Sequence, residues 1–344
     1  MTQRRLGILF AVSIAVLALA VWVAHDEHRG SASVAGMTVL PGLANHLNDV
    51  TSVRITGPGG KRVTLARGAA RWMVKSVGYP ADSGRLRKLL IDLGNLKAMA
   101  RKTRLKQNYP LLGVQSVSAA DASGVRIDVV SPKRTWSLIV GHNDEGIGSY
   151  VRRAGHRQTL LAGPLVMADA KPAEWLEPII VDVRRKQVRS IEEHPAGERP
   201  YRIERAKATD VNFHVIGIPP GRALASAAAG NAVASALSNL TLSDVRKAAP
   251  APKGARLSSA QFTRFDGLTV ALSGYHAAKK GPYYIELTAH AAGPKAAAAA
   301  AAARINARVH GWQYRLPSYT FKQIFQPLSG LLKPLPKPHP SARR

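Results

Sequence analysis

Three short segments combine residue types that bind phosphate or metal ions. Residues 57–62, Gly-Pro-Gly-Gly-Lys-Arg, are similar to a phosphate-binding loop, but no Ser or Thr follows Gly-Lys and the segment joins two expected strands. We therefore predict a hairpin turn. Residues 25–28, His-Asp-Glu-His, directly follow an apolar run, where polar residues ordinarily end a membrane-spanning helix. Residues 142–146, His-Asn-Asp-Glu-Gly, lie between alternating runs and are predicted to form a hairpin loop, with cation binding as the alternative.

The hydroxyl and aromatic side chains form no recognisable catalytic set. Ser149 lies in Gly-Ile-Gly-Ser-Tyr, which differs from the Gly-x-Ser-x-Gly nucleophile elbow, and no His or Asp is placed to complete a triad. We predict no catalytic residue, no cofactor and no metal ion. The interaction candidates are Tyr79, Trp175 and Trp312. Both tryptophans stand among aliphatic residues, where core packing is the ordinary role and a groove lining the alternative, and Tyr79 is most simply part of a strand-to-helix break.

The charge balance bears on partners more than on fold. The chain has 49 basic and 21 acidic residues, a formal net charge of +28, and no cysteine. Its basic residues are scattered, and the longest basic run is Arg184-Arg185-Lys186, so we predict no nucleic-acid partner. Two explanations remain for the charge: a solvated basic surface, or attraction to anionic lipid headgroups or acidic envelope polymers.

Residues 6–24 contain no charge, and eleven of them are Leu, Ile, Phe or Val. At 1.5 Å per residue a helix of this length covers a hydrocarbon core of about 30 Å. Arg4 and Arg5 precede it, so the positive-inside rule predicts a single-pass bacterial inner-membrane protein with a cytoplasmic N-terminus and a periplasmic body. The alternative is a signal peptide cleaved at Ala18-Leu19-Ala20, but the apolar run is longer than a signal core.

Alternation of apolar residues with a period of two predicts the strands. Residues 50–74 are expected to form an antiparallel meander, residues 83–93 a helix with a leucine stripe capped by Asp82 or Ser83, and residues 125–161 a second meander. The same order then recurs at an offset of 138 residues. Six positions of the first half match six positions of the second half: Val50 and Val188, Val53 and Ile191, Gly59 and Gly197, Val63 and Tyr201, Leu65 and Ile203, and Arg67 and Arg205. Val233, Leu237 and Leu240 are predicted to form the second helix stripe, and the alanines of 296–303 to start a later helix.

These patterns predict an α+β fold: an N-terminal transmembrane helix, then a duplicated unit of antiparallel meander, helix and second meander. The expected boundaries are 1–30 for the cytoplasmic stub and anchor, 31–178 and 179–330 for the two repeats, and 331–344 for a disordered, basic, proline-rich tail.

The chain resembles the bacterial domain-of-unknown-function family 4340, whose members pair an N-terminal anchor with a strand-rich exported body. The similarity covers nearly everything after residue 30. It rests on four segments in order: Leu40-Pro41-Gly42-Leu43 ahead of Asn48-Asp49-Val50, then Tyr79-Pro80-Ala81-Asp82, Glu174-Trp175-Leu176, and Trp312-Gln313-Tyr314-Arg315-Leu316-Pro317-Ser318-Tyr319. Some members resemble auxiliary components of ATP-binding-cassette (ABC) transporters, which implies an accessory role. The basic surface and the alanine run depart from the family pattern.

Three functional hypotheses follow. The first is a non-enzymatic, membrane-anchored accessory or binding protein whose body docks on another envelope protein, as an auxiliary of an ABC-type transporter. The second is a binder of anionic lipid or envelope polymer that uses the basic surface. The third is a hydrolase whose residues are dispersed over both halves, because such sites are recognised by geometry.

Overall fold

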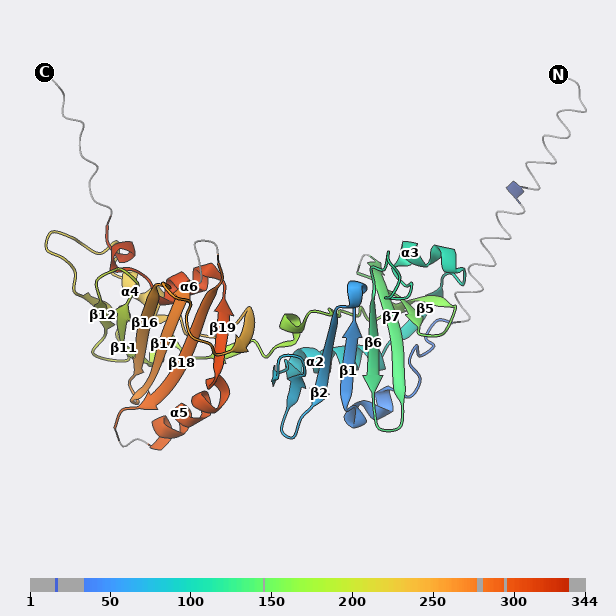
Figure 1. Ribbon diagram of the computed structural model, residues 1–344, viewed down its shortest axis with the longest axis horizontal. Helices are drawn as coiled ribbons and strands as arrows, with labels where there is room; N and C mark the ends of the chain where they lie inside the picture. Colours follow the sequence, from blue (N-terminus) through green and yellow to red (C-terminus); the bar gives the residue numbers. More distant parts are fainter. Residues whose placement is uncertain (1–15, 18–33, 145, 277–280, 294–295, 334–344) are drawn as a thin grey trace, which may run out of the picture. The chain divides into compact units, whose positions relative to one another are not determined.

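The structure, a computed structural model, describes residues 16–17, 34–144, 146–276, 281–293 and 296–333 (Figure 1). The chain divides into two compact units, Met1–Leu176 (unit 1) and Glu177–Arg344 (unit 2). Both are dominated by antiparallel sheets with few helices, so the fold is α+β, as predicted. The expected anchor, apart from Val16 and Leu17, lies outside the described residues. Within the described ranges, no helix has both the length and the apolar character needed to cross a membrane.

Unit 1 is built on a nine-stranded sheet in the order β4-β3-β2-β1-β6-β7-β8-β9-β5. Its strands are β1 Ser52–Thr56, β2 Arg62–Arg67, β3 Trp72–Val74, β4 Tyr79–Pro80, β5 Lys97–Arg101, β6 Val125–Val130, β7 Thr135–Asp144, β8 Gly148–Arg153 and β9 Thr159–Gly163. Its helices are α2 Ser83–Gly94 and α3 Tyr109–Leu112, and its 3-10 turns are η1 Ala44–Asp49, η2 Pro58–Gly60, η3 Lys106–Asn108 and η4 Pro172–Trp175.

Local sequence explains these elements well. The carboxylate of Asp82 caps α2 by accepting a hydrogen bond from the Arg85 backbone N–H at 2.9 Å, and the predicted leucine stripe is buried. Residues 57–60 form a turn between β1 and β2, as predicted, with Gly59 and Gly60 at positive φ. The edge strand β5 is far from β9 in sequence, so only the tertiary structure brings the two together.

Unit 2 is built on an eight-stranded sheet in the order β13-β12-β11-β16-β17-β18-β19-β15, beside a two-stranded sheet β10-β14. The strands are β10 Ile179–Val181, β11 Val188–His194, β12 Tyr201–Glu204, β13 His214–Ile216, β14 Leu240–Thr241, β15 Asp244–Lys247, β16 Leu257–Arg264, β17 Leu268–His276, β18 Tyr283–Ala291 and β19 Trp312–Leu316. The helical segments are η5 Arg185–Gln187, α4 Ala229–Ala234, α5 Ala296–Val309, α6 Ser318–Ile324 and η6 Leu328–Leu331.

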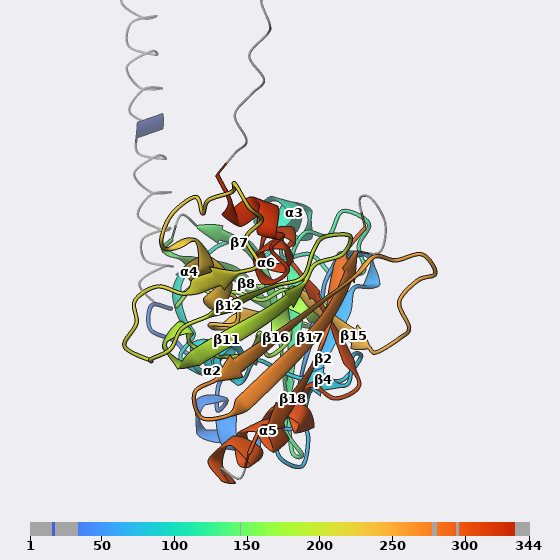
Figure 2. The same ribbon diagram turned by 90° about the vertical axis from the view of Figure 1, so that its left-hand side faces the viewer.

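Of the helices of unit 2, α5 was predicted correctly and α4 only in part. The alanine run starts α5, as predicted, and α5 packs on β17 and β18 (Figure 2). The prediction that one helix carries Val233, Leu237 and Leu240 was wrong. Helix α4 ends at Ala234, and Leu240 lies in β14. Asn239, just before β14, adopts a positive φ of 52°, a backbone conformation that a continuing helix does not allow. Leu331 and Leu332, assigned above to the tail, are buried in unit 2.

Candidate functional site: an apolar pocket with a cationic rim

A pocket lies at the β5 edge of the unit 1 sheet, where three stretches of chain meet. Residues 36–39 run along the outer edge of β5: Ala98 donates its backbone N–H to the Met37 carbonyl oxygen and accepts one from Gly36, both at 2.8 Å. On its other side β5 pairs with β9, with Arg101 opposite Leu160. The turn between β8 and β9 closes the site.

The floor of this pocket is apolar. It is formed by Val34, Met37, Val39, Ala98 and Leu160, of which Val34, Val39 and Ala98 are buried. The pocket has a volume of about 170 Å³. For scale, a dry apolar cavity of about 150 Å³ accepts benzene. The floor therefore has room for a compact hydrocarbon group of about six carbons.

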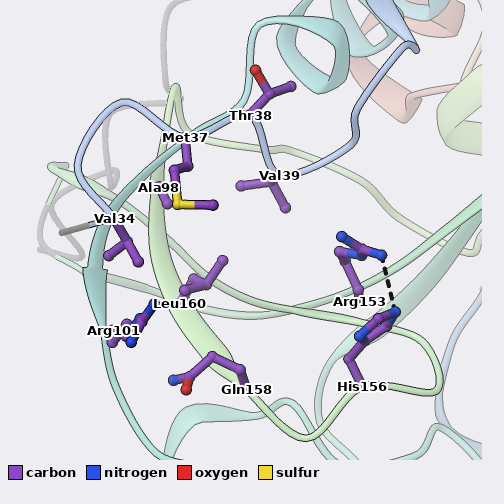
Figure 3. Close-up of a pocket in the computed structure, with 10 residues that line it drawn as sticks. All are labelled: Val34, Met37, Thr38, Val39, Ala98, Arg101, Arg153, His156, Gln158 and Leu160. Atoms are coloured by element: carbon purple, nitrogen blue, oxygen red, sulfur yellow. Dashed lines mark hydrogen bonds between the residues drawn. The ribbon is translucent and has the colours of Figure 1, made fainter. Parts of the chain in front are cut away.

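The rim is cationic and polar (Figure 3). Arg153 donates a hydrogen bond from Nη2 to Nε2 of His156 at 3.0 Å, and Arg101 lies elsewhere on the rim. Gln158 donates to the carbonyl oxygen of Thr159. None of these three basic side chains is within 4.0 Å of a carboxylate belonging to the described residues, and the lining contains no Asp or Glu.

This combination favours one kind of ligand. Arginine presents planar N–H donors that match a carboxylate or phosphate, and such charge-assisted hydrogen bonds are about twice as strong as neutral ones. An apolar floor contributes binding energy by removing hydrocarbon from water. The pocket is therefore suited to an amphiphilic anion.

The predicted interaction residues lie elsewhere. Tyr79 is fully buried in β4, and Trp175 is fully buried with its Nε1–H donated to the Asp169 carbonyl oxygen at 2.7 Å and the Arg85 guanidinium 5.0 Å above its ring. Trp312 belongs to unit 2, partly exposed, with Lys247 Nζ 3.7 Å from its ring centre. None of the three lines the pocket described here.

The segments weighed for chemistry have structural contacts. The hairpin-loop prediction was wrong for His142, Asn143 and Asp144, which belong to strand β7, because this strand pairs with β8 as far as Asp144; Glu145 lies outside the described residues. Ser149 is fully buried: its hydroxyl donates to Asn143 Oδ1 and accepts the Val166 N–H, both at 3.0 Å. Over the described stretches, no three His, Cys, Asp or Glu side chains gather where they could hold a metal ion.

Neither the pocket nor the burial of one acidic residue was predicted from the sequence. Arg101, Arg153 and His156 gave no signal because basic residues occur throughout the chain. Glu193 in β11 is fully buried, and neither carboxylate oxygen has a hydrogen-bond partner in the described part of the chain. Burial raises its pKa to about 9. The offset of 138 could have revealed it, because it aligns Glu193 with Ile55.

The comparisons with known proteins identify a family. The family model described as "Domain of unknown function (DUF4340)" matches residues 72–259, more than half of the chain. The chain belongs to this family. No curated protein and no solved structure matches it.

The DUF4340 match begins in β3 of unit 1 and ends in β16 of unit 2, so it spans the boundary between the units. It includes Arg101, Arg153 and His156 of the rim as well as Glu193. The floor residues Val34, Met37 and Val39 precede it.

Proposed function

We propose that this DUF4340 protein is a non-enzymatic binding protein of the cell envelope, anchored in the inner membrane by residues 6–24, whose unit 1 pocket holds an amphiphilic anion. The observation that carries the proposal is the pocket itself, in which Arg101, Arg153 and His156 rim an apolar floor with no acid in the lining. Binding, and not turnover, is proposed because the lining offers no nucleophile paired with a base.

The two units are further proposed to be copies of one ancestral unit. What supports this is strand order: β2-β1-β6-β7-β8-β9-β5 in unit 1 parallels β12-β11-β16-β17-β18-β19-β15 in unit 2. Register agrees as well, since Val53 pairs with Leu65 as Ile191 pairs with Ile203, both at the offset of 138. On this view the pocket is a property acquired or kept by unit 1.

The binding proposal is tested by titration calorimetry with the full chain in phosphatidylcholine nanodiscs, with empty nanodiscs as the blank. Hexanoate is the probe, and hexylammonium, of equal chain length and opposite charge, is its matched control. Hexanoate should bind and hexylammonium should not, because the rim is cationic. Equal binding of the two would refute the proposal.

A pair of variants localises the site. Arg153→Glu should weaken hexanoate binding by about tenfold to a hundredfold, because a hydrogen bond to a charged group contributes roughly 1.5–3 kcal/mol. Arg157→Glu makes the same change of charge four residues later, in the turn after β8 and outside the lining, and should leave binding unchanged. If both variants weakened binding alike, the effect would be one of overall charge and the pocket assignment would fail.

The accessory role is the cellular setting we propose for this binding activity, with an ABC-type transporter as the partner. It is tested by crosslinking in intact cells, capture through a C-terminal tag and mass spectrometry. Reproducible recovery of the subunits of one transporter supports the role. Recovery of lipid or wall material alone would leave the second hypothesis, binding of anionic lipid or polymer, as the setting.

A further inference from the structure

Beside the pocket, unit 1 carries an exposed segment that combines cations with large apolar side chains. Residues 102–111 include Lys102, Arg104 and Lys106, all exposed, together with Leu105 at 58% and Leu111 at 75% exposure. We call these five residues the basic face. No Asp or Glu occurs between residues 93 and 120.

The basic face is held firmly against the pocket rim. Lys102 donates its backbone N–H to the Thr159 carbonyl oxygen, and the Thr159 N–H is donated to the Thr103 carbonyl oxygen, both at 2.9 Å. Farther along, the Tyr109 hydroxyl donates to the carbonyl oxygen of Arg157 at 2.6 Å. Arg101, the last residue of β5, belongs to the pocket rim and directly precedes Lys102. The basic face therefore adjoins the pocket along the chain, at the end of β5, while its Lys102 ammonium lies 5.9 Å from the centre of the Tyr150 ring on the side of the sheet that α3 covers (Figure 1).

The cations of the basic face form no ion pair with the described residues, although Lys102 Nζ lies 5.9 Å from the centre of the Tyr150 ring. None of the three is within 4.0 Å of a carboxylate in the ranges that the structure describes. Leu111 follows Pro110 in the single turn of α3, which is tied down by the buried Tyr109 ring stacked 4.6 Å from the Arg152 guanidinium. Leu111 is thus presented to solvent by a rigid element, although exposing a leucine to water is unfavourable.

We infer that the basic face docks on the surface of a bilayer containing anionic lipid, with Leu105 and Leu111 inserted between headgroups. Three cations flanking two exposed leucines complement a negatively charged surface that has an apolar interior, which is how polybasic segments and interfacial anchors bind membranes.

The inference rests on the proposed anchor for its geometry. Nine residues, 25–33, separate residue 24 from Val34, the first described residue of the pocket floor, and a chain of that length spans at most about 35 Å. The pocket is therefore within reach of the same membrane. A membrane lipid is then the class of amphiphilic anion that the pocket meets.

The absence of cysteine from the chain makes the test direct. In the full chain, Leu111→Cys is labelled with an environment-sensitive fluorophore and reconstituted into vesicles of phosphatidylcholine alone or with phosphatidylglycerol. Leu257→Cys, also exposed at 62% but in unit 2, is the matched control. The label at position 111 should shift to the blue and be quenched by a lipid-borne quencher only in the anionic vesicles, and the label at 257 should not respond.

Two further comparisons complete the design. The combined change Lys102→Glu, Arg104→Glu and Lys106→Glu should abolish the response at position 111, whereas Arg184→Glu, Arg185→Glu and Lys186→Glu, equal in charge, should preserve it. Salt at about 1 M, where the Debye length is about 3 Å, should weaken the response. The inference is overturned if the label at 111 behaves alike in neutral and anionic vesicles, or if both charge-reversed chains respond alike.

The experiments distinguish a failure of membrane docking from a failure of the proposed ligand binding. Hexanoate binding in neutral nanodiscs tests the pocket without any anionic surface, and the label at position 111 tests docking without any pocket ligand. Loss of docking with hexanoate binding intact would overturn only the membrane contact of the basic face.

Discussion

Replacing Glu193 by glutamine should make unit 2 more stable, and increasingly so as the pH rises. Glu193 is fully buried in β11 between Tyr201 of β12 and Ala260 of β16, with no partner for its carboxylate in the described chain. At the corresponding place in unit 1, Ile55 lies between Val63 and Ile127. A buried charge without a partner is costly, so the folded protein keeps this carboxyl protonated.

The magnitude follows from the pKa difference. The pKa of Glu193 is about 9 in the folded chain, against 4.5 for the ordinary side chain. Because the folded value is the higher one, stability is fully present below about pH 4.5 and is lost as the pH rises towards about 9. Each pH unit in this window costs roughly 1 to 2 kcal/mol of unfolding free energy, so unit 2 should lose about 3 kcal/mol between about pH 6 and pH 8. Glutamine does not ionise, and Glu193→Gln should remove this slope.

The assay is pulse proteolysis of the full chain in graded urea, with mass spectrometry to assign the surviving fragments to unit 1 or unit 2. Glu192→Gln is the matched control, because Glu192 is the exposed neighbour in the same strand. Wild type and Glu192→Gln should lose unit 2 stability in parallel over this pH window, while Glu193→Gln stays level. Parallel profiles for all three proteins would refute the assignment of a protonated, buried Glu193.

Three further substitutions test the packing of unit 1 by the same assay. Trp175→Ala should cost about 3–5 kcal/mol of unfolding free energy, because a fully buried indole is replaced by a cavity; a cost below about 1 kcal/mol would contradict its core position. Asp82→Ala should cost about 1 kcal/mol through loss of the α2 cap, and Asp82→Ser should restore most of it. Gly148→Ala should cost about 1–3 kcal/mol, because a Cβ there would lie 2.4 Å from the Ala162 carbonyl oxygen and push β8 from β9; an unchanged urea midpoint would contradict this packing.

Local patterns predicted the elements whose residues interact with near neighbours in sequence. The β1-β2 hairpin, the capped α2 and the start of α5 follow from strand alternation, an Asp before a leucine stripe, and a run of the best helix former. The extension of α4 through Leu237 and Leu240 was mispredicted because a helical spacing of leucines also fits a short helix followed by a strand.

The sequence by itself determined the charge of this protein, with a large excess of basic over acidic residues and no cysteine. It also determined the alternation of apolar residues from which the strands of the two sheet-rich units form. Only the tertiary structure decided which cations act together. Arg101 and Arg153 line one pocket because β5 and β8 both pair with β9 at the sheet edge, long-range contacts that no local period encodes. Likewise Glu193 follows the same alternation as Ile55, and its pKa is raised because the folded unit buries it between β12 and β16 and removes the water that would stabilise its charge.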